Sequence, residues 1–399
     1  MTSPLINERP KLEVADVIRA HGDEFRAKFA AWLSDSQLKA LRDIARCRTA
    51  ELGGHVERCL DCGHERFAYN SCRNRHCPKC QAQSRAEWLA RQAEHLLPVD
   101  YYHLVFTLPD ELAELAKANP STMYDLLFTE AAATIREVAA NPERLGAMPG
   151  LLLVLHTWGQ TLMHHPHVHG VVTGGGLSCN ASGTIDANPK WVSCKKGFFL
   201  PVRVLSRVFR GKYLDALKRV HHRLRFFGKH EALADPAAFQ AFVSPLYKKE
   251  WVVYAKKPFG GPAQVLKYLA RYTHRVAIGN SRLVSLENGK VSFHYKDYAD
   301  EHKQKTMTLD ALEFLRRFVQ HVLPRGFVKM RHYGLLANRF REARLQAVRR
   351  LLLVEVIAEA VRQSSEEPTE LEPPKERCCE KCGSRRLECV PLPKARNTS

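Results

Sequence analysis

Two histidines at alternate positions offer the first chemistry in this chain. They belong to the run His164-His165-Pro166-His167-Val168-His169. If this run is a strand, His167 and His169 point to the same face and can bind one divalent cation together. Such an ion acts as a Lewis acid toward a phosphate under attack. Gln160 is the candidate third ligand, because the expected hairpin brings it near His167. The alternative is a set of histidines that bind no metal.

A pair of tyrosines further along the chain offers nucleophiles. In Tyr268-Leu-Ala-Arg-Tyr272 the phenols stand at i and i+4, and the apolar spacing after Pro262 predicts a helix that places them on one face. A tyrosine with its usual pKa of about 10 is a poor nucleophile unless a metal or a cation assists. A basic stripe beside them would favour the ionised phenol and hold a phosphodiester. It consists of Lys267, Arg271 and Arg275. The alternative is that both tyrosines simply pack in an amphipathic helix.

Two Cys-x-x-Cys knuckles in the N-terminal part predict a zinc site. Four thiolates from such knuckles bind one Zn²⁺ tetrahedrally. The expected ligands are Cys59, Cys62, Cys77 and Cys80. Cys72, His64 and His76 either support these ligands or replace one of them. Basic residues around the second knuckle suggest contact with nucleic acid, the alternative being a purely structural zinc: Arg73, Arg75 and Lys79.

The cysteines near the C-terminus contain one more Cys-x-x-Cys pair. They are Cys378, Cys379, Cys382 and Cys389. A second small zinc site and unligated thiols are both open interpretations of this group. In an intracellular protein, cysteines are more often metal ligands or free thiols than disulfides.

The overall charge favours a polyanionic partner. The chain has 61 Lys and Arg against 42 Asp and Glu, which leaves a net charge of +19. The sequence contains no stretch of about 18 apolar residues that would predict a membrane span, and Met1–Leu12 lacks the pattern of a signal peptide. A cytoplasmic protein is therefore expected. Together with the histidine and tyrosine pairs, the charge suggests cutting and rejoining of DNA through a phosphotyrosine link.

Strands in hairpins and separate helices must position these residues. Strand character is found in four segments: 101–108, 151–158, 167–173 and 250–255. The third of these is expected to end at Gly174-Gly175-Gly176, and Asn288-Gly289 predicts a further hairpin. Helical patterns cover six segments: 10–50, 81–97, 111–140, 205–227, 309–322 and 338–362. Hairpins combined with segregated helices indicate an α+β fold.

A strongly basic stretch follows the tyrosine segment. Residues 316–350 hold ten Lys or Arg and one acidic residue, Glu342. Aromatic and glycine residues interleave the charges, which favours a surface that tracks phosphates. The DNA-binding candidates in this stretch are Arg331, Arg339 and Arg341. A solvated helix face is the alternative.

Longer motifs in a fixed order resemble the two-tyrosine HUH transposases of rolling-circle insertion sequences, the bacterial insertion sequence family ninety-one. The resemblance covers nearly the whole chain. It includes the second cysteine knuckle, the histidine and tyrosine segments and two motifs in the basic stretch. Its motifs are 69–81, 104–109, 156–177, 268–272, 321–327 and 331–338.

The resemblance implies a fold and an activity. It implies an HUH-endonuclease-type antiparallel sheet with helices, in which His167 and His169 lie on a middle strand and the tyrosine helix lies against that face. A zinc ribbon would precede this sheet, and a basic helical region would follow it. The implied activity is metal-dependent transesterification of single-stranded DNA at insertion-sequence ends, with Tyr268 and Tyr272 as nucleophiles and 5′-phosphotyrosine intermediates. The implied cofactors are Mg²⁺ or Mn²⁺ at the active site and Zn²⁺ in the ribbon, in a bacterial, nucleoid-associated protein.

Four domains are expected from the order of these motifs. They are N-terminal helices with a zinc-binding ribbon (1–98), an HUH catalytic transposase domain (99–305), a basic helical DNA-binding region (306–365), and a linker with a cysteine-containing tail (366–399). Two alternatives share parts of this interpretation. A plasmid replication initiator or relaxase uses the same chemistry but normally lacks the long N-terminal ribbon. A zinc-containing DNA-binding protein would have no catalysis.

Overall fold

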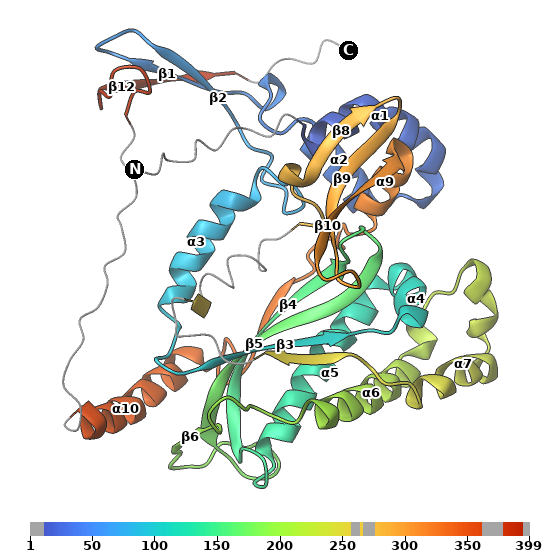
Figure 1. Ribbon diagram of the computed structural model, residues 1–399, viewed down its shortest axis with the longest axis vertical. Helices are drawn as coiled ribbons and strands as arrows, with labels where there is room; N and C mark the ends of the chain where they lie inside the picture. The colour runs from blue at the N-terminus through green and yellow to red at the C-terminus, as the bar shows by residue number, and fades with distance from the viewer. Residues whose placement is uncertain (1–11, 257–263, 266–275, 361–377, 394–399) are drawn as a thin grey trace. The chain divides into compact units, whose positions relative to one another are not determined.

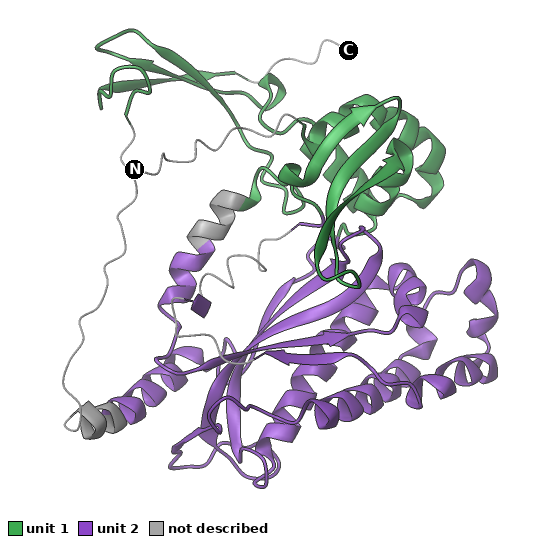
Figure 2. Cartoon of the chain, in the orientation of Figure 1, with its two compact units in different colours: residues 1–84, 278–322, 363–399 green, residues 85–277, 323–362 purple. Residues whose placement is uncertain are grey.

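The chain forms two compact units, which are coloured separately in Figure 2. The computed structural model describes residues 12–256, 264–265, 276–360 and 378–393. Unit 1 combines three segments of the chain: 1–84, 278–322 and 363–399. Unit 2 combines two segments: 85–277 and 323–362. Along the sequence, unit 2 therefore interrupts unit 1 twice.

Unit 2 is built on an antiparallel sheet with the strand order β11-β4-β5-β3-β7, and β6 pairs with β5 (Figure 1). Its strands are β3 (Tyr101–Thr107), β4 (Ala147–Trp158), β5 (His164–Ser178), β6 (Trp191–Ser193), β7 (Val253–Lys256) and β11 (Met330–Gly334). The long strands β4 and β5 are joined by the loop 159–163 and form a central hairpin. This confirms the predicted α+β class and places the histidine run on a middle strand.

One face of this sheet packs against helices. The helices of this region are α4 (Ala113–Ala118), α5 (Pro120–Ala140), α6 (Val202–Arg219) and α7 (Pro236–Val243). Proline in the first turn suits the start of both α5 and α7. Alternate residues of the strands join the helices in one core, for example Leu104, Leu153 and Val168, each with 0% of its surface exposed. Each such side chain contributes about 1.5–3 kcal/mol on burial, so this core holds the hairpin rigidly.

The opposite face carries the histidines. In the register of β4 and β5, His156 pairs with His167 and Val154 pairs with His169. Residues directly paired across an antiparallel ladder point to the same side. Next to them a smaller apolar cluster covers the same face, and it consists of Trp88, Tyr101, Leu152, Val154, Val171 and Val265.

The strand β5 continues through Gly174, Gly175 and Gly176, where the sequence pattern predicted that it would end. A Cβ on Gly175 would lie 2.6 Å from the ring of Trp191, and a Cβ on Gly176 would lie 2.4 Å from the carbonyl oxygen of Met148. The glycines therefore allow neighbouring chain to approach closely, which is a common reason for glycine inside a strand. The prediction of a break at this point was wrong.

Two more helices belong wholly or in part to unit 2: α3 (Gln81–Ala93) and α10 (Arg341–Ala360). Leu345 and Val348 of α10 are fully buried in a cluster with Trp191 of β6. The predicted basic helical region thus contains a strand as well, because β11 adds to the sheet by pairing with β4.

The first part of unit 1 combines helices with a three-stranded antiparallel sheet. It contains α1 (Val14–Phe29), α2 (Asp35–Ala45) and α9 (Ala311–Val319), together with the sheet β8 (Leu283–Glu287), β9 (Lys290–Asp297) and β10 (Lys303–Asp310). Asn288 and Gly289 have φ of 49° and 72°, as the predicted hairpin turn requires. Ser34 begins α2 with a reciprocal cap to Gln37.

The second part of unit 1 is a three-stranded antiparallel ribbon sheet with the order β12-β1-β2. Its strands are β1 (Gly54–Cys59), β2 (Glu65–Tyr69) and β12 (Leu387–Leu392). The strand β12 pairs with β1 from Gly54↔Leu392 to Cys59↔Leu387. A segment near the C-terminus thus completes the N-terminal ribbon.

The two units cut across the predicted domain ranges. Residues 278–305 were expected in the catalytic domain but belong to unit 1, where Phe293 of β9 packs against Phe314 of α9. Residues 323–362 were expected in a separate basic region but belong to unit 2, because β11 joins its sheet. Among the described residues, no helix has the length and apolar composition that crossing a membrane requires.

Candidate active site and zinc centre

Three imidazoles meet on the histidine face of unit 2. They belong to His156 of β4 and to His167 and His169 of β5. One ring nitrogen of each lies within 4.8 Å of the others. The ring centroids of His156 and His169 are 4.5 Å apart, and those of His167 and His169 are 4.8 Å apart. This grouping has the composition and size of a metal site.

Hydrogen bonds set which nitrogen of each β5 histidine faces the centre. The Nδ1–H of His167 donates to the carbonyl oxygen of His165 at 2.7 Å, which leaves its Nε2 as an acceptor. The Nδ1 of His169 lies 3.0 Å from Nε2 of His103, and the Nε2 atoms of His167 and His169 lie 3.1 Å apart. Two nitrogens that each lie about 2.1 Å from one ion are about 3.0–3.4 Å apart. The spacing of these two Nε2 atoms agrees with that value, so the residues present fit a metal ion.

His103 of β3 was not predicted from the sequence. It is buried, its ring stacks on that of His169 with the centroids 5.2 Å apart, and burial lowers its pKa to about 3. The hydrogen bond between Nε2 of a neutral His103 and Nδ1 of His169 fixes the orientation of the His169 ring. The strand Tyr101–Thr107 was predicted, but nothing in the sequence marks this one histidine as a partner of His169.

His156, and not Gln160, lies opposite His167. The side chain of His156 is buried and stacks on Trp158, with the centroids 4.6 Å apart. Gln160 follows the end of β4 and lies in the loop 159–163, so the predicted register was wrong. Two features bring His156 rather than Gln160 opposite His167: the register shifts between His156 and Trp158, and the loop 159–163 is short.

Both predicted nucleophiles, Tyr268 and Tyr272, lie outside the described residues, as do Lys267, Arg271 and Arg275. On the N-terminal side of this segment, the nearest described residues are Gln264 and Val265, which are helical. Val265 is fully buried in the cluster on the histidine face, against Val154 and Val171 among others. The segment that leads to the tyrosines therefore begins on the same face of the sheet as the three imidazoles.

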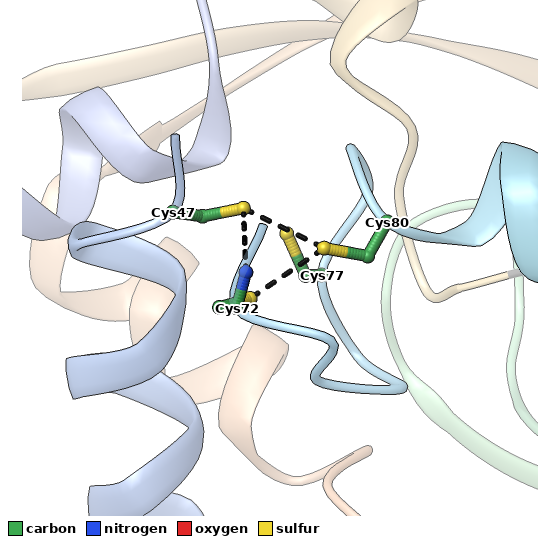
Figure 3. A group of neighbouring side chains, drawn as sticks. All are labelled: Cys47, Cys72, Cys77 and Cys80. Atoms are coloured by element: carbon green, nitrogen blue, oxygen red, sulfur yellow. Dashed lines mark hydrogen bonds between the residues drawn. The ribbon is translucent and has the colours of Figure 1, made fainter. Parts of the chain in front are cut away.

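A group of four cysteines forms a second centre, in unit 1 (Figure 3). Its members are Cys47, Cys72, Cys77 and Cys80. The Sγ of Cys80 lies 3.5 Å from that of Cys47 and 3.6 Å from that of Cys72. Cys47 is fully buried beyond the end of α2, and Cys80 precedes α3. The hydrogen bond between Cys47 and Cys72 lowers the pKa of the first thiol and raises that of the second, so the thiols of this group ionise as an interacting set.

The predicted zinc ligands are divided between two sites. Cys77 and Cys80 belong to the group in Figure 3, whereas Cys59 and Cys62 lie with Cys379 and Cys382 at the other group. The prediction of one shared ion was wrong, because β1 and β2 carry the first knuckle away from the second. Cys72 replaces a knuckle cysteine, as one of the open interpretations held. Cys47, the fourth member of this group, was not predicted, because no other cysteine lies close enough in the sequence to form a Cys-x-x-Cys knuckle with it.

The three DNA-binding candidates of the basic stretch 316–350 have different surroundings. Arg331 forms an ion pair with Asp125, and its guanidinium lies 4.4 Å from the ring centroid of Phe128. Arg339 is exposed, and Arg341 is half-buried at the start of α10. Arg331 therefore has a structural role in unit 2, and Arg339 is the better candidate for a phosphate contact.

Comparisons with known proteins identify the class to which this fold and these sites belong. A family described as "Putative transposase" matches residues 150–344, which include the three histidines of the active-site group. A family described as "Transposase zinc-binding domain" matches residues 17–108, which include the cysteines of Figure 3. The class is that of zinc-binding transposases. No solved structure matches the chain.

Two curated relatives narrow the class to a family. The chain is 50% identical over 366 residues to "Putative transposase y4qJ" of Sinorhizobium fredii, covering 91% of this chain and 88% of that protein. It is 29% identical over 311 residues to the transposase for insertion sequence element IS801 of Pseudomonas savastanoi pv. phaseolicola, covering 77% and 72%. The chain belongs to the transposases of insertion sequence family ninety-one (IS91). The resemblance expected from the sequence motifs is confirmed.

Proposed function

We propose that this transposase cuts and rejoins single-stranded DNA at insertion-sequence ends, with tyrosine hydroxyls as nucleophiles. The observation that carries the proposal is the group of three imidazoles on the histidine face, where Val265 also packs. Tyr268 and Tyr272 follow Val265 closely in the sequence. A metal ion acting together with two phenols would supply the chemistry of phosphodiester transfer.

The proposed metal ligands are His156, His167 and His169, with His156 in the place first assigned to Gln160. A bound divalent ion would supply Lewis-acid polarisation of the scissile phosphate. Mg²⁺ is bound in proteins mainly through oxygen ligands, so of the two expected ions Mn²⁺ is the better match to three imidazoles, although imidazole ligands in general suit later transition metals more. His103 would hold His169 in the tautomer that leaves its Nε2 available.

The proposed reaction conserves the phosphodiester bond energy. The phenolic oxygen of one tyrosine attacks phosphorus, and the bond from phosphorus to the 3′ oxygen breaks. This yields a 5′-phosphotyrosine and a free 3′-hydroxyl. The second tyrosine can cleave a second strand in the same way, and attack by a 3′-hydroxyl on a phosphotyrosine rejoins DNA without ATP. Lys267, Arg271 and Arg275 would hold the phosphates, and Arg339 and Arg341 would extend the DNA-binding surface.

Covalent capture of DNA tests the proposal. The protein is incubated with labelled single-stranded DNA that carries a hairpin from the element's end, in the presence of Mn²⁺, and adducts are separated under denaturing conditions. We expect an adduct from the wild type and none from the Tyr268→Phe/Tyr272→Phe double variant. The single variants serve as matched controls, since each retains one nucleophile. DNA binding by the wild type without any adduct would support a non-catalytic DNA-binding protein and would overturn the proposal.

A further inference from the structure

Four cysteines from distant parts of the chain gather at one end of the ribbon sheet in unit 1. They are Cys59, Cys62, Cys379 and Cys382, and their Sγ atoms all lie within 4.8 Å of one another. The Sγ atoms of Cys59 and Cys382 are 3.5 Å apart, and those of Cys62 and Cys379 are 3.6 Å apart. Zinc–sulfur bonds of about 2.3 Å in a tetrahedron place the sulfurs about 3.8 Å apart. These four sulfurs are therefore already spaced as zinc ligands.

The two halves of this group have the same backbone turn. In the first half, the N–H of Cys59 donates to the carbonyl of His64 at 2.9 Å, and the N–H of Gly63 donates to the carbonyl of Cys59 at 2.9 Å. In the second half, Cys379 and Gly383 make the equivalent bonds at 2.7 and 2.9 Å, the first of them to the carbonyl of Ser384. Both glycines have positive φ, 68° and 74°. The sequence Cys-x-x-Cys-Gly thus forms one kind of zinc knuckle twice.

Contacts other than sulfur hold the two halves together. The strands β1 and β12 pair along six residues of each. Arg386 forms an ion pair of 2.8 Å with Asp61 inside the first knuckle, and Arg66 forms one of 2.7 Å with Glu380 inside the second. Glu57, which is buried, also pairs with Arg66. The arrangement of the four thiols therefore follows from the pairing of the strands and their charged residues.

We propose that Cys59, Cys62, Cys379 and Cys382 bind a second Zn²⁺, separate from the ion at Cys47, Cys72, Cys77 and Cys80. This ion fastens the C-terminal strand to the N-terminal ribbon. The zinc-binding family match ends at residue 108, so it does not include the second pair of ligands. Each cysteine thiol that binds releases its proton to solvent and coordinates as the thiolate, and no redox step is involved.

Zinc content of the full-length chain tests the proposal. All variants carry His167→Ala and His169→Ala, so that the histidine group does not contribute metal, and purification is under reducing conditions. Elemental analysis and native mass spectrometry are expected to give two zinc ions per chain. Adding Cys379→Ser and Cys382→Ser is expected to leave one ion. The matched control adds Cys378→Ser and Cys389→Ser, which are exposed cysteines outside both four-cysteine groups, and it should retain two.

A second measurement needs no change to the cysteines. Chelated protein with the same histidine substitutions is titrated with Co²⁺, and the thiolate-to-metal absorption is expected to rise until two equivalents are bound. Saturation at one equivalent would overturn the proposal, even if the Cys379→Ser/Cys382→Ser variant fails to fold. Equal zinc content in that variant and its control would overturn it too. So would an intact mass showing two disulfides within this group in the zinc-loaded protein.

Discussion

At the scale of single residues, local spacing predicts the group of three histidines only in part. His167 and His169 could be predicted, because two positions on one strand share a face whatever the rest of the chain does. His156 could not, because its position opposite His167 depends on the register shift before Trp158 and on the length of the loop. His103 is brought to His169 only by the pairing of β3 with β5.

The identity of the third ligand leads to a prediction. His156→Ala should weaken Mn²⁺ binding by at least about 100-fold, since even the partners of metal ligands matter by about 10–100-fold. Isothermal titration with Mn²⁺ measures the change. Gln160→Ala is the control and should bind Mn²⁺ like the wild type. The reverse result, with strong loss in Gln160→Ala alone, would restore Gln160 as the ligand and remove His156.

At the scale of elements, a sequence pattern predicted the structure correctly where its cause is local, as in a tight turn. It failed where the cause is a contact with a segment that is distant in the sequence. The hairpin at Asn288-Gly289 was predicted because its turn needs two residues with positive φ. The three glycines of β5 do not form a turn. They fit there because Trp191 and Met148 approach the strand too closely for a side chain.

Two glycine substitutions should have opposite effects on stability. Gly176→Ala should lower the free energy of unfolding by about 3 kcal/mol or more, because the added Cβ meets backbone at 2.4 Å. Gly211→Ala in α6 should raise it by up to about 1 kcal/mol, because no atom lies within 4 Å of its added Cβ and alanine favours the helix. Urea unfolding of the two variants measures both. A Gly176→Ala variant as stable as the wild type would show that β5 can shift to accept a side chain.

At the scale of the whole molecule, the sequence hides which segments belong together. Cys59 and Cys62 were paired with Cys77 and Cys80 because these knuckles are near in the sequence. The first knuckle and the segment from Cys379 to Gly383 share the pattern Cys-x-x-Cys-Gly, and this likeness indicates better which cysteines lie together. The segment Cys77-Pro78-Lys79-Cys80 lacks that glycine. The composition of unit 1 from three segments has no local signature, so the domain ranges could not be predicted.

Removal of zinc should affect the two units differently. Both four-cysteine groups belong to unit 1, and structural zinc contributes about 10–16 kcal/mol in small zinc domains. Chelation should therefore speed amide hydrogen exchange at least about 100-fold in peptides from β1 and β2. In protein that carries His167→Ala and His169→Ala, so that the histidine group holds no metal, peptides from β4 and β5 should exchange as before and serve as the internal control. Equal loss of protection in both sets of peptides would contradict the assignment of zinc to unit 1 alone.

The pairing of β12 with β1 also has a consequence for synthesis. While the chain emerges from a ribosome, β1 and β2 appear early, but β1 has an uncovered edge until Leu387–Leu392 has been translated. An uncovered strand edge is a template for pairing with other chains. A nascent or prematurely terminated chain that lacks residues 387–392 would thus leave its ribbon unfinished, and the three-stranded ribbon can form only after β12 has been translated.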